Sequence, residues 1–234
     1  NTVREIAGEK AGIIVPGVPV IYDGNDKDAA EVIAAKAKEL GSPAYKVIQA
    51  GAKVLGNNKD GIDFSLEDDY YGDTRFHIPF IAWYQVMNAS LALTTMEVLK
   101  DRIPVTMEQL QAGIANTRWQ GRMETILPGV IVDGAHNEDG VRRFVETAER
   151  FQKEYPLTLL FSAVNDKHYQ DMIHTICSRI KFRKVVTTEV GGYREVPSAE
   201  LAEIFCKEGC KDVGNSDNIE EAFHMAHEAK GEDG

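Results

Sequence analysis

The regular alternation of strand and helix patterns in the second half of the chain is the feature that most limits its fold. Strands are predicted at 129–133, 157–163, 183–189 and 211–214, and helices at 138–152, 168–180, 198–207 and 217–229. Strands that are separated by helices usually pair in parallel. This half is therefore predicted to form a doubly wound α/β sheet, with residues 129–133 as its first strand.

The first half of the chain has a different pattern. Helices are predicted at 2–12, 26–41, about 85–100 and 107–116, and strands at 17–24 and 45–49. Between them, residues 51–82 carry turn signals between short aromatic strands, which are typical of antiparallel hairpins. The chain length favours two domains, and the loss of pattern near residues 116–124 places their boundary. We predict domains at 1–118 and 119–234.

Charge and cysteine content exclude several classes of protein. The formal net charge is −11, whereas a nucleic-acid binder needs a basic surface. The three cysteines do not form a disulfide framework, so a reducing, cytoplasmic location is expected. Cys206 and Cys210 are one helical turn apart, a weak metal half-site for which helix packing is the alternative. No apolar run is long enough to span a membrane, so no membrane partner is expected.

The segment DGAHN, residues 133–137, forms a polar corner directly after a predicted strand. Ligands of doubly wound sheets bind at the carboxyl ends of the strands. Asp133 can accept hydrogen bonds from two ribose hydroxyls, His136 can donate to a phosphate, and Asn137 or Asp139 can cap the next helix. The alternative is an ordinary turn with a solvated histidine, and this segment alone does not decide between them.

Three segments occur in a particular order: IAGEKAGIIVPGVPVI (6–21), YQVMNASLAL (84–93) and TRWQGRMETILPGVIVDGAHN (117–137). Together they resemble the folylpolyglutamate synthase / dihydrofolate synthase family of the Mur ligase superfamily, over nearly the whole chain. The resemblance implies the C-terminal part of a central ATPase domain with a small β-hairpin sheet, followed by a Rossmann-like C-terminal domain. No glycine-rich phosphate loop of the G-x-x-x-x-G-K-[ST] type occurs here, so the chain is expected to be a piece of a larger protein and inactive alone.

The resemblance also implies site residues in the first domain. Lys10 matches the lysine that takes up carbon dioxide as a carbamate and binds Mg²⁺, a catalytic and metal role; a surface lysine is the alternative. Asn88 matches the asparagine that contacts the adenine of ATP; capping of its helix is the alternative. The segment before it, AWYQ (82–85), departs from the G-x-H-Q that is usual in the family. The resemblance therefore does not fix the local contacts of Gln85.

In the second domain, Arg122 matches an arginine that reaches the phosphates of ATP, with Arg118 as a weaker candidate. Asp133 matches the ribose-binding acid. His136 matches a residue near the phosphates and the incoming glutamate, so it is assigned to both catalysis and ATP binding. Closure of the two domains would bring Arg122 and the DGAHN corner onto ATP held by the other domain.

The resemblance implies an ATP-dependent amide ligase that adds L-glutamate to folates through an acyl phosphate, and to dihydropteroate as a second activity. The expected cofactors are ATP and Mg²⁺, with a monovalent cation as a further candidate, and the protein is expected to be a monomer. The alternative is a non-catalytic nucleotide-binding module that keeps the Mur ligase fold. A related Mur-type ligase of cell-wall precursors is disfavoured by EKAGI (9–13).

Overall fold

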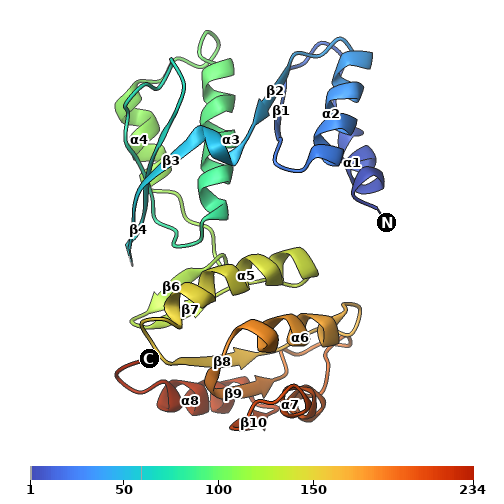
Figure 1. Ribbon diagram of the computed structural model, residues 1–234, viewed down its shortest axis with the longest axis vertical. Coiled ribbons are helices and arrows are strands. Elements are labelled where there is room, and N and C mark those ends of the chain that lie inside the picture. Colours follow the sequence, from blue (N-terminus) through green and yellow to red (C-terminus); the bar gives the residue numbers. More distant parts are fainter. Residues whose placement is uncertain (1, 59) are drawn as a thin grey trace. The chain divides into compact units, whose positions relative to one another are not determined.

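The computed structural model describes residues 2–58 and 60–234. It divides into two compact units, Asn1–Trp119 and Gln120–Gly234, each of which has its own sheets and hydrophobic cores (Figure 1). Both units combine helices with strands, as the α/β prediction requires. None of the helices in the described ranges is both long and apolar enough to cross a bilayer.

The first unit begins with a small α/β layer. Helix α1 (Val3–Ala11) starts at a capping box, in which the side chains of Thr2 and Glu5 each accept a hydrogen bond from the other residue's backbone amide, and α2 (Lys27–Glu39) is capped by Asp26. Strands β1 (Val20–Asp23) and β2 (Ala44–Val47) pair in parallel. The carboxyl ends of β1 and β2 therefore lie at one edge, where ligands of such sheets bind.

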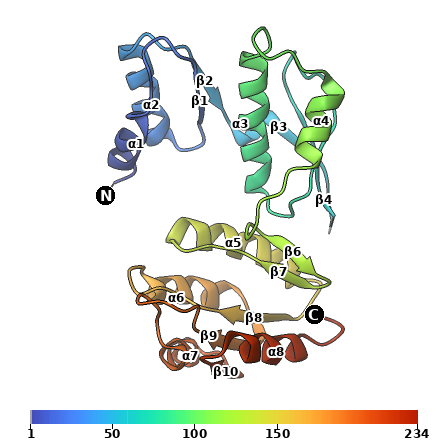
Figure 2. The ribbon, with the colours of Figure 1, turned by 180° about the vertical axis from the view of Figure 1, so that it is seen from behind.

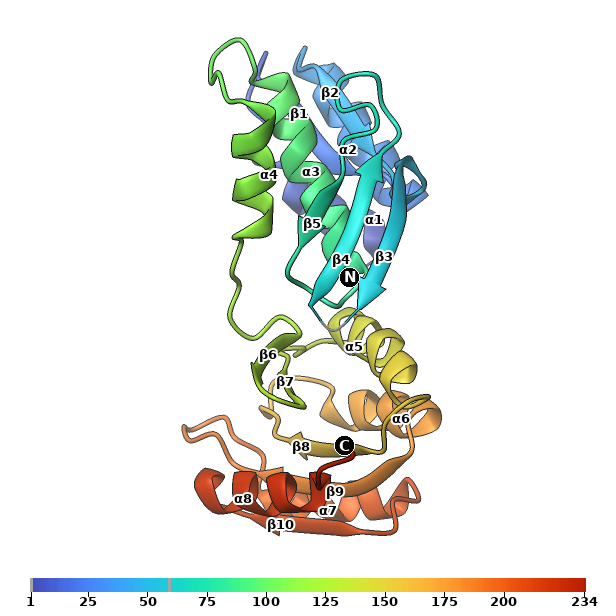
Figure 3. The same cartoon turned by 90° about the vertical axis from the view of Figure 1, so that its left-hand side faces the viewer.

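A three-stranded antiparallel sheet follows, as the turn signals predicted. It contains β3 (Ala52–Asn58), β4 (Gly61–Leu66) and β5 (Phe76–Ile78), after a short 3₁₀ turn, η1 (Gln49–Gly51). Helices α3 (Tyr84–Val98) and α4 (Met107–Ala115) complete the unit. Helix α3 contacts both sheets, and Figures 1 and 3 show it between the β1–β2 pair and the antiparallel sheet.

The core of this unit is aromatic. Phe64 and Phe76 are fully buried on neighbouring strands, with ring centroids 5.8 Å apart. Tyr71 packs edge-on against Phe76 and donates its hydroxyl hydrogen to the Leu93 carbonyl oxygen at 2.8 Å, which ties the sheet to α3. Helix α3 is therefore anchored to the antiparallel sheet through Tyr71.

An ion cluster on the antiparallel sheet gives a pH-dependent prediction. The Arg75 guanidinium donates to Asp63 at 2.6 Å, and His77 Nδ1 lies 3.0 Å from the other carboxylate oxygen. These contacts, that of Arg75 first, hold the pKa of Asp63 below its usual value. A carboxylate with a lowered folded-state pKa stabilises the fold above its unfolded pKa, and this stability is lost as the pH falls through the folded pKa.

We therefore expect Asp63→Asn to lower the stability of the first unit by about 1 kcal/mol at pH 7. Below about pH 4 the difference from the wild type should shrink as Asp63 becomes protonated. Both tryptophans, Trp83 and Trp119, lie in the first unit, so urea unfolding followed by tryptophan fluorescence reports on it. A difference that stays constant down to pH 2.5 would contradict the assignment.

The second unit contains the predicted parallel sheet. Strands β8 (Leu157–Phe161), β9 (Phe182–Thr188) and β10 (Val213–Ser216) pair in the order β10-β9-β8. The helices are α5 (Glu138–Phe151), α6 (Tyr169–Arg179), α7 (Ser198–Lys207) and α8 (Ile219–Lys230). Val185 and Val186 are both fully buried, because α6 and α7 cover one face of β9 and α8 covers the other (Figure 2).

The prediction for residues 129–133 was wrong in one respect. Strand β7 (Val130–Val132) does not pair with the parallel sheet; it pairs antiparallel with β6 (Glu124–Leu127), which the sequence pattern had not indicated. The linking Pro128-Gly129 pair explains this, because Gly129 adopts φ +70° and turns the chain straight back. The polar corner therefore follows a hairpin rather than a buried central strand.

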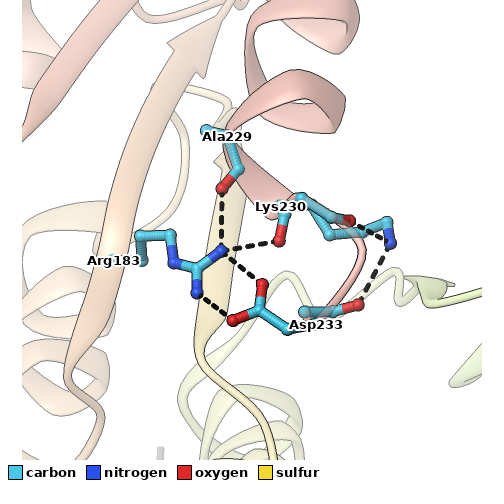
Figure 4. Close-up of polar contacts among 6 residues, drawn as sticks. Arg183, Ala229, Lys230 and Asp233 are labelled. Carbon is cyan, nitrogen blue, oxygen red and sulfur yellow. Dashed lines mark hydrogen bonds and ion pairs between the residues drawn. The ribbon is translucent and has the colours of Figure 1, made fainter.

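Polar contacts fix both ends of α8. Asn218 caps its start by accepting from the backbone amides of Glu220 and Glu221. The preceding Asp217 accepts the hydroxyl hydrogen of Ser198. After α8, Arg183 of β9 forms two hydrogen bonds with Asp233 and donates to the carbonyl oxygen of Lys230 (Figure 4). These contacts fasten the last residues to the sheet.

The three cysteines are free thiols, of which Cys177 and Cys210 are half-buried and Cys206 is exposed. Cys177 and Cys210 lie with their sulfur atoms 3.7 Å apart, a proximity that the sequence spacing of Cys206 and Cys210 did not suggest. Burial raises the pKa of Cys177 to about 12, and it also raises that of Cys210. Such thiols hold little thiolate near neutral pH, and Cys210 packs against Cys177 whereas Cys206 is exposed.

Candidate functional site

The polar corner after β7 is clamped to the start of the second unit. Each carboxylate oxygen of Asp133 accepts a backbone hydrogen bond at 2.9 Å, one from Met123 and the other from Ala135. The amide of Gly134 also donates to the Gly121 carbonyl oxygen at 2.7 Å. Residues 121–124 and 133–135 therefore form one bracket, and Arg122 is part of it.

Asp133 is electrostatically unusual for a turn residue. Burial raises its pKa, while the amide hydrogen bonds from Met123 and Ala135 and the positive charge of Arg122 act in the opposite direction. An aspartate that merely caps an exposed turn would not pay this desolvation penalty. The combination of a half-buried acid with a nearby arginine is typical of a binding site.

Met123 has an uncommon backbone conformation in this bracket. It is the only non-glycine residue of the described chain with positive φ, at +50°, and its side chain is 3% exposed. For a residue with a Cβ, this left-handed conformation costs about 1 kcal/mol. This conformation directs the Met123 amide toward Asp133, so the strained backbone holds the carboxylate in position.

A pair of variants tests this strain. We expect Met123→Ala to destabilise the second unit by about 2–4 kcal/mol through loss of buried volume. Glycine is normally about 0.5–1 kcal/mol worse than alanine, but here we expect Met123→Gly to be as stable as Met123→Ala or more so. Urea unfolding followed by circular dichroism compares them; the usual alanine advantage would contradict a left-handed Met123.

His136 lies beside Asp133 and is exposed. Its Nδ1 is 2.8 Å from the Gly134 carbonyl oxygen. Because a carbonyl oxygen only accepts, Nδ1 must carry the hydrogen, and in the neutral ring Nε2 is then an acceptor. The ring can therefore take a proton at Nε2, or donate to an anion from Nε2 once it is charged. Asn137 accepts from the Gly140 amide and caps α5.

Asn88 lies in the second turn of α3, because the helix begins at Tyr84. It therefore does not cap the helix, which was the alternative to a binding role. Its side-chain amide donates to Gln85 Oε1 at 2.8 Å, and the residue remains exposed. The neighbouring Met87 contacts Asn25, which follows β1 and also accepts from the amide of Gln49 after β2. This part of α3 thus packs at the carboxyl edge of the β1–β2 pair.

Lys10 lies in the last turn of α1 and is exposed. Carbamate formation needs a neutral amine, which burial or a cationic neighbour would favour, and an exposed position supplies no such burial. The residues described here therefore do not by themselves fit a Lys10 carbamate with Mg²⁺. Arg118, the weaker arginine candidate, is exposed and donates to the adjacent Thr117 carbonyl oxygen.

One group of possible metal ligands was not predicted. Glu138, His168 and Asp171 are exposed, and their ligand atoms lie within 4.8 Å of one another. No sequence pattern predicts this group, because Glu138 starts α5 whereas the other two lie at the start of α6. Exposed carboxylates often gather at helix starts, where they interact with the helix dipole.

The structure thus brings Arg122, Asp133 and His136 together in the second unit, while Lys10 and Asn88 lie in the first. Sequence reasoning missed two contributors, Met123 and Asn25, and it named Gln85 without assigning it a partner. Gln85 and Asn88 are three residues apart, a spacing that places two side chains on one helix face.

Comparisons with known proteins agree with this architecture. Residues 121–234 match the Mur ligase, glutamate ligase domain family. The chain is 35% identical to the dihydrofolate synthase/folylpolyglutamate synthase of Bacillus subtilis over 194 residues, which are 78% of this chain and 44% of that protein. The crystal structure of folylpolyglutamate synthase from Thermotoga maritima has a TM-score of 0.78 and 26% identity, covering 95% of this chain and 52% of that one.

A folylpolyglutamate synthase solved with AMPPCP and folate has a TM-score of 0.72 at 25% identity, covering 97% of this chain and 57% of that one. The fold and the matched domain define a protein of the Mur ligase type. Within it, the chain belongs to the folylpolyglutamate synthase / dihydrofolate synthase family. It spans about half the length of the relatives it matches.

Proposed function

We propose that this chain forms part of an ATP-dependent amide ligase that adds L-glutamate to folates, with dihydropteroate as a second acceptor. The observation that carries the proposal is the bracket of residues 121–124 and 133–135, which holds a half-buried carboxylate beside an arginine. It lies within the region that matches the glutamate ligase domain.

The proposed roles follow from the chemistry of each side chain. Arg122 contacts the phosphates of ATP, because its planar, permanently charged guanidinium suits phosphate oxygens. Asp133 accepts hydrogen bonds from the ribose hydroxyls through lone pairs that its two amide donors leave open. Asn88 contacts the adenine. Nε2 of His136 lies toward the reacting groups, where it accepts or returns the proton of the incoming amine.

The metal part of the proposal rests on the family resemblance. Mg²⁺, when bound, neutralises phosphate charge during transfer. A carbamate at Lys10 would need surroundings that favour a neutral amine, in addition to the residues described here. A cytoplasmic location and a monomeric state belong to the same proposal, as does the absence of nucleic-acid and membrane partners.

Calorimetric titration of the chain with ADP tests the nucleotide part of the proposal. We expect saturable binding with one ADP per chain, and the absence of binding at millimolar ADP would contradict it. The ligase part is tested on the protein that contains this chain, by phosphate release from ATP that requires both a folate and L-glutamate. Nucleotide binding without phosphate release would favour the non-catalytic module, and phosphate release that needs neither folate nor L-glutamate would contradict the ligase proposal.

A further inference from the structure

Gln85 and Asn88 form a polar pair on one face of α3. Gln85 is 3% exposed, and its Oε1 accepts a hydrogen bond of 2.8 Å from Asn88 Nδ2. The Gln85 Nε2 atom is buried without a hydrogen-bond partner in the described part of the chain. Asn88, one turn later, is exposed. A buried amide thus holds an exposed one in a defined orientation.

An unpartnered buried amide nitrogen is costly, and native proteins contain few of them. Methionine or leucine at position 85 would fill the same space without that cost. The hydrogen bond to Asn88 is the only side-chain interaction of Gln85 that offsets it among the described residues. Buried polar side chains with an unsatisfied atom tend to be kept where they orient a functional group.

We propose that Gln85 is a positioning residue that fixes the order of the Asn88 oxygen and nitrogen atoms, and thereby selects adenine over 6-oxopurines. The proposal rests on the proposed contact between Asn88 and the base. Because Asn88 Nδ2 is turned toward Gln85, Asn88 presents its Oδ1 and its remaining N–H in one fixed order.

That order matches only one class of purine. Adenine carries a 6-amino donor next to the N7 acceptor, and an asparagine amide pairs with both at once. Hypoxanthine and guanine carry a 6-oxo acceptor in the same place. With the amide in this orientation, Oδ1 would then face an oxygen, which is repulsive, and turning the Asn88 amide alone would place its Oδ1 against Gln85 Oε1.

Two variants distinguish the proposed orientation of the Asn88 amide, with Nδ2 toward Gln85, from the reversed orientation. Methionine has a length similar to glutamine, so Gln85→Met keeps the packing and frees the Asn88 amide to rotate. Gln85→Glu keeps an oxygen that accepts from Asn88 Nδ2. If the true order were reversed, with Gln85 donating to Asn88 Oδ1, then glutamate would disrupt it. Ser90→Ala is the matched control, because Ser90 is a buried polar residue of α3 whose hydroxyl donates to the Val86 carbonyl oxygen.

The experiment is calorimetric titration of each chain with ADP and with IDP, the hypoxanthine analogue. We expect the wild type to prefer ADP about tenfold or more. Gln85→Met should lower this ratio to about threefold, since one base contact is then no longer oriented. Gln85→Glu and Ser90→Ala should keep the wild-type ratio. Tryptophan-detected melting confirms that each variant is folded.

The inference is overturned if Gln85→Met keeps the wild-type ratio, if Gln85→Glu loses it, or if the wild type binds ADP and IDP equally. A wild type that binds neither nucleotide would instead contradict the proposed function, and the inference with it. Hydrogen exchange of the wild-type chain, followed by NMR, is an independent test. The Asn88 side-chain amide signals should show one hydrogen protected from solvent exchange, and two rapidly exchanging hydrogens would overturn the fixed order.

Discussion

Replacing Asp133 with alanine is expected to abolish measurable ADP binding and to destabilise the second unit by about 2–4 kcal/mol. The carboxylate accepts from the amides of Met123 and Ala135 at 2.9 Å. Alanine leaves both amides without their acceptor and removes the proposed ribose contact. Calorimetry measures the first effect, and urea unfolding followed by circular dichroism measures the second.

Asp139→Ala is the matched control for this variant. Asp139 lies in the first turn of α5 and forms ion pairs with the exposed Arg142 and the half-buried Arg143. The variant removes the same charge as Asp133→Ala. We expect its ADP affinity to stay within about twofold of the wild type, since exposed ion pairs contribute little. If Asp133→Ala and Asp139→Ala behave alike, the corner is an ordinary turn.

Asp133→Asn tests the direction in which stability changes with pH, because it keeps one acceptor oxygen and removes the charge. Burial raises the folded-state pKa of Asp133. Its contribution to stability is therefore fully present below the unfolded pKa, near pH 4, and declines as the pH rises through the folded pKa. The stability advantage of the wild type over Asp133→Asn should shrink in that direction, and growth of the advantage would contradict the burial of this carboxylate.

Arg122→Ala is expected to weaken ADP binding by about 10–100-fold, the loss of one charge-assisted phosphate contact. Because the Arg122 charge opposes the raised pKa of Asp133, the same variant should raise that pKa further. A carbon-13 NMR titration of the Asp133 carboxyl measures this second effect. Together the two readouts test whether Arg122 acts on both nucleotide and carboxylate.

Arg118→Ala serves as the control for Arg122. Arg118 is exposed and donates to the adjacent backbone carbonyl, so we expect less than about threefold change in ADP affinity. The assignment of Arg122 would be wrong if the Arg118 variant lost more affinity, or if the pKa of Asp133 did not move in the Arg122 variant.

Local sequence patterns predicted most of the elements, because each pattern is satisfied within one element. Thr106 and Gln109 have the spacing of a capping box and form one at the start of α4, and Gly41, with φ +63°, follows the end of α2. Val141, Val145 and Ala148 recur at helical spacing and are buried in the core of the second unit. In these cases the local preference and the tertiary packing agree.

Strand pairing could not be predicted in the same way. The apolar run before Asp133 suits a buried parallel strand and an exposed hairpin equally well, and only the turn at Pro128-Gly129 decides. Short apolar runs carry no period that distinguishes these environments.

The candidate site was predicted in part. The segment DGAHN and Arg122 were found from the sequence, whereas the support of Asp133 by a strained Met123 was not. A positive φ at methionine leaves no trace in residue type, since glycine or asparagine is the usual signal. The Gln85–Asn88 bond likewise depends on side-chain burial, which spacing alone does not give.

The central claim is that the bracket around Asp133 binds a nucleotide. Titration of ADP into the nitrogen-15-labelled chain tests it most directly, because the amides of Met123 and Ala135 are themselves bonded to Asp133. We predict saturable shifts of these two amide signals, together with that of the Asn88 side chain. Shifts confined to other residues, or no shifts at millimolar ADP, would contradict it.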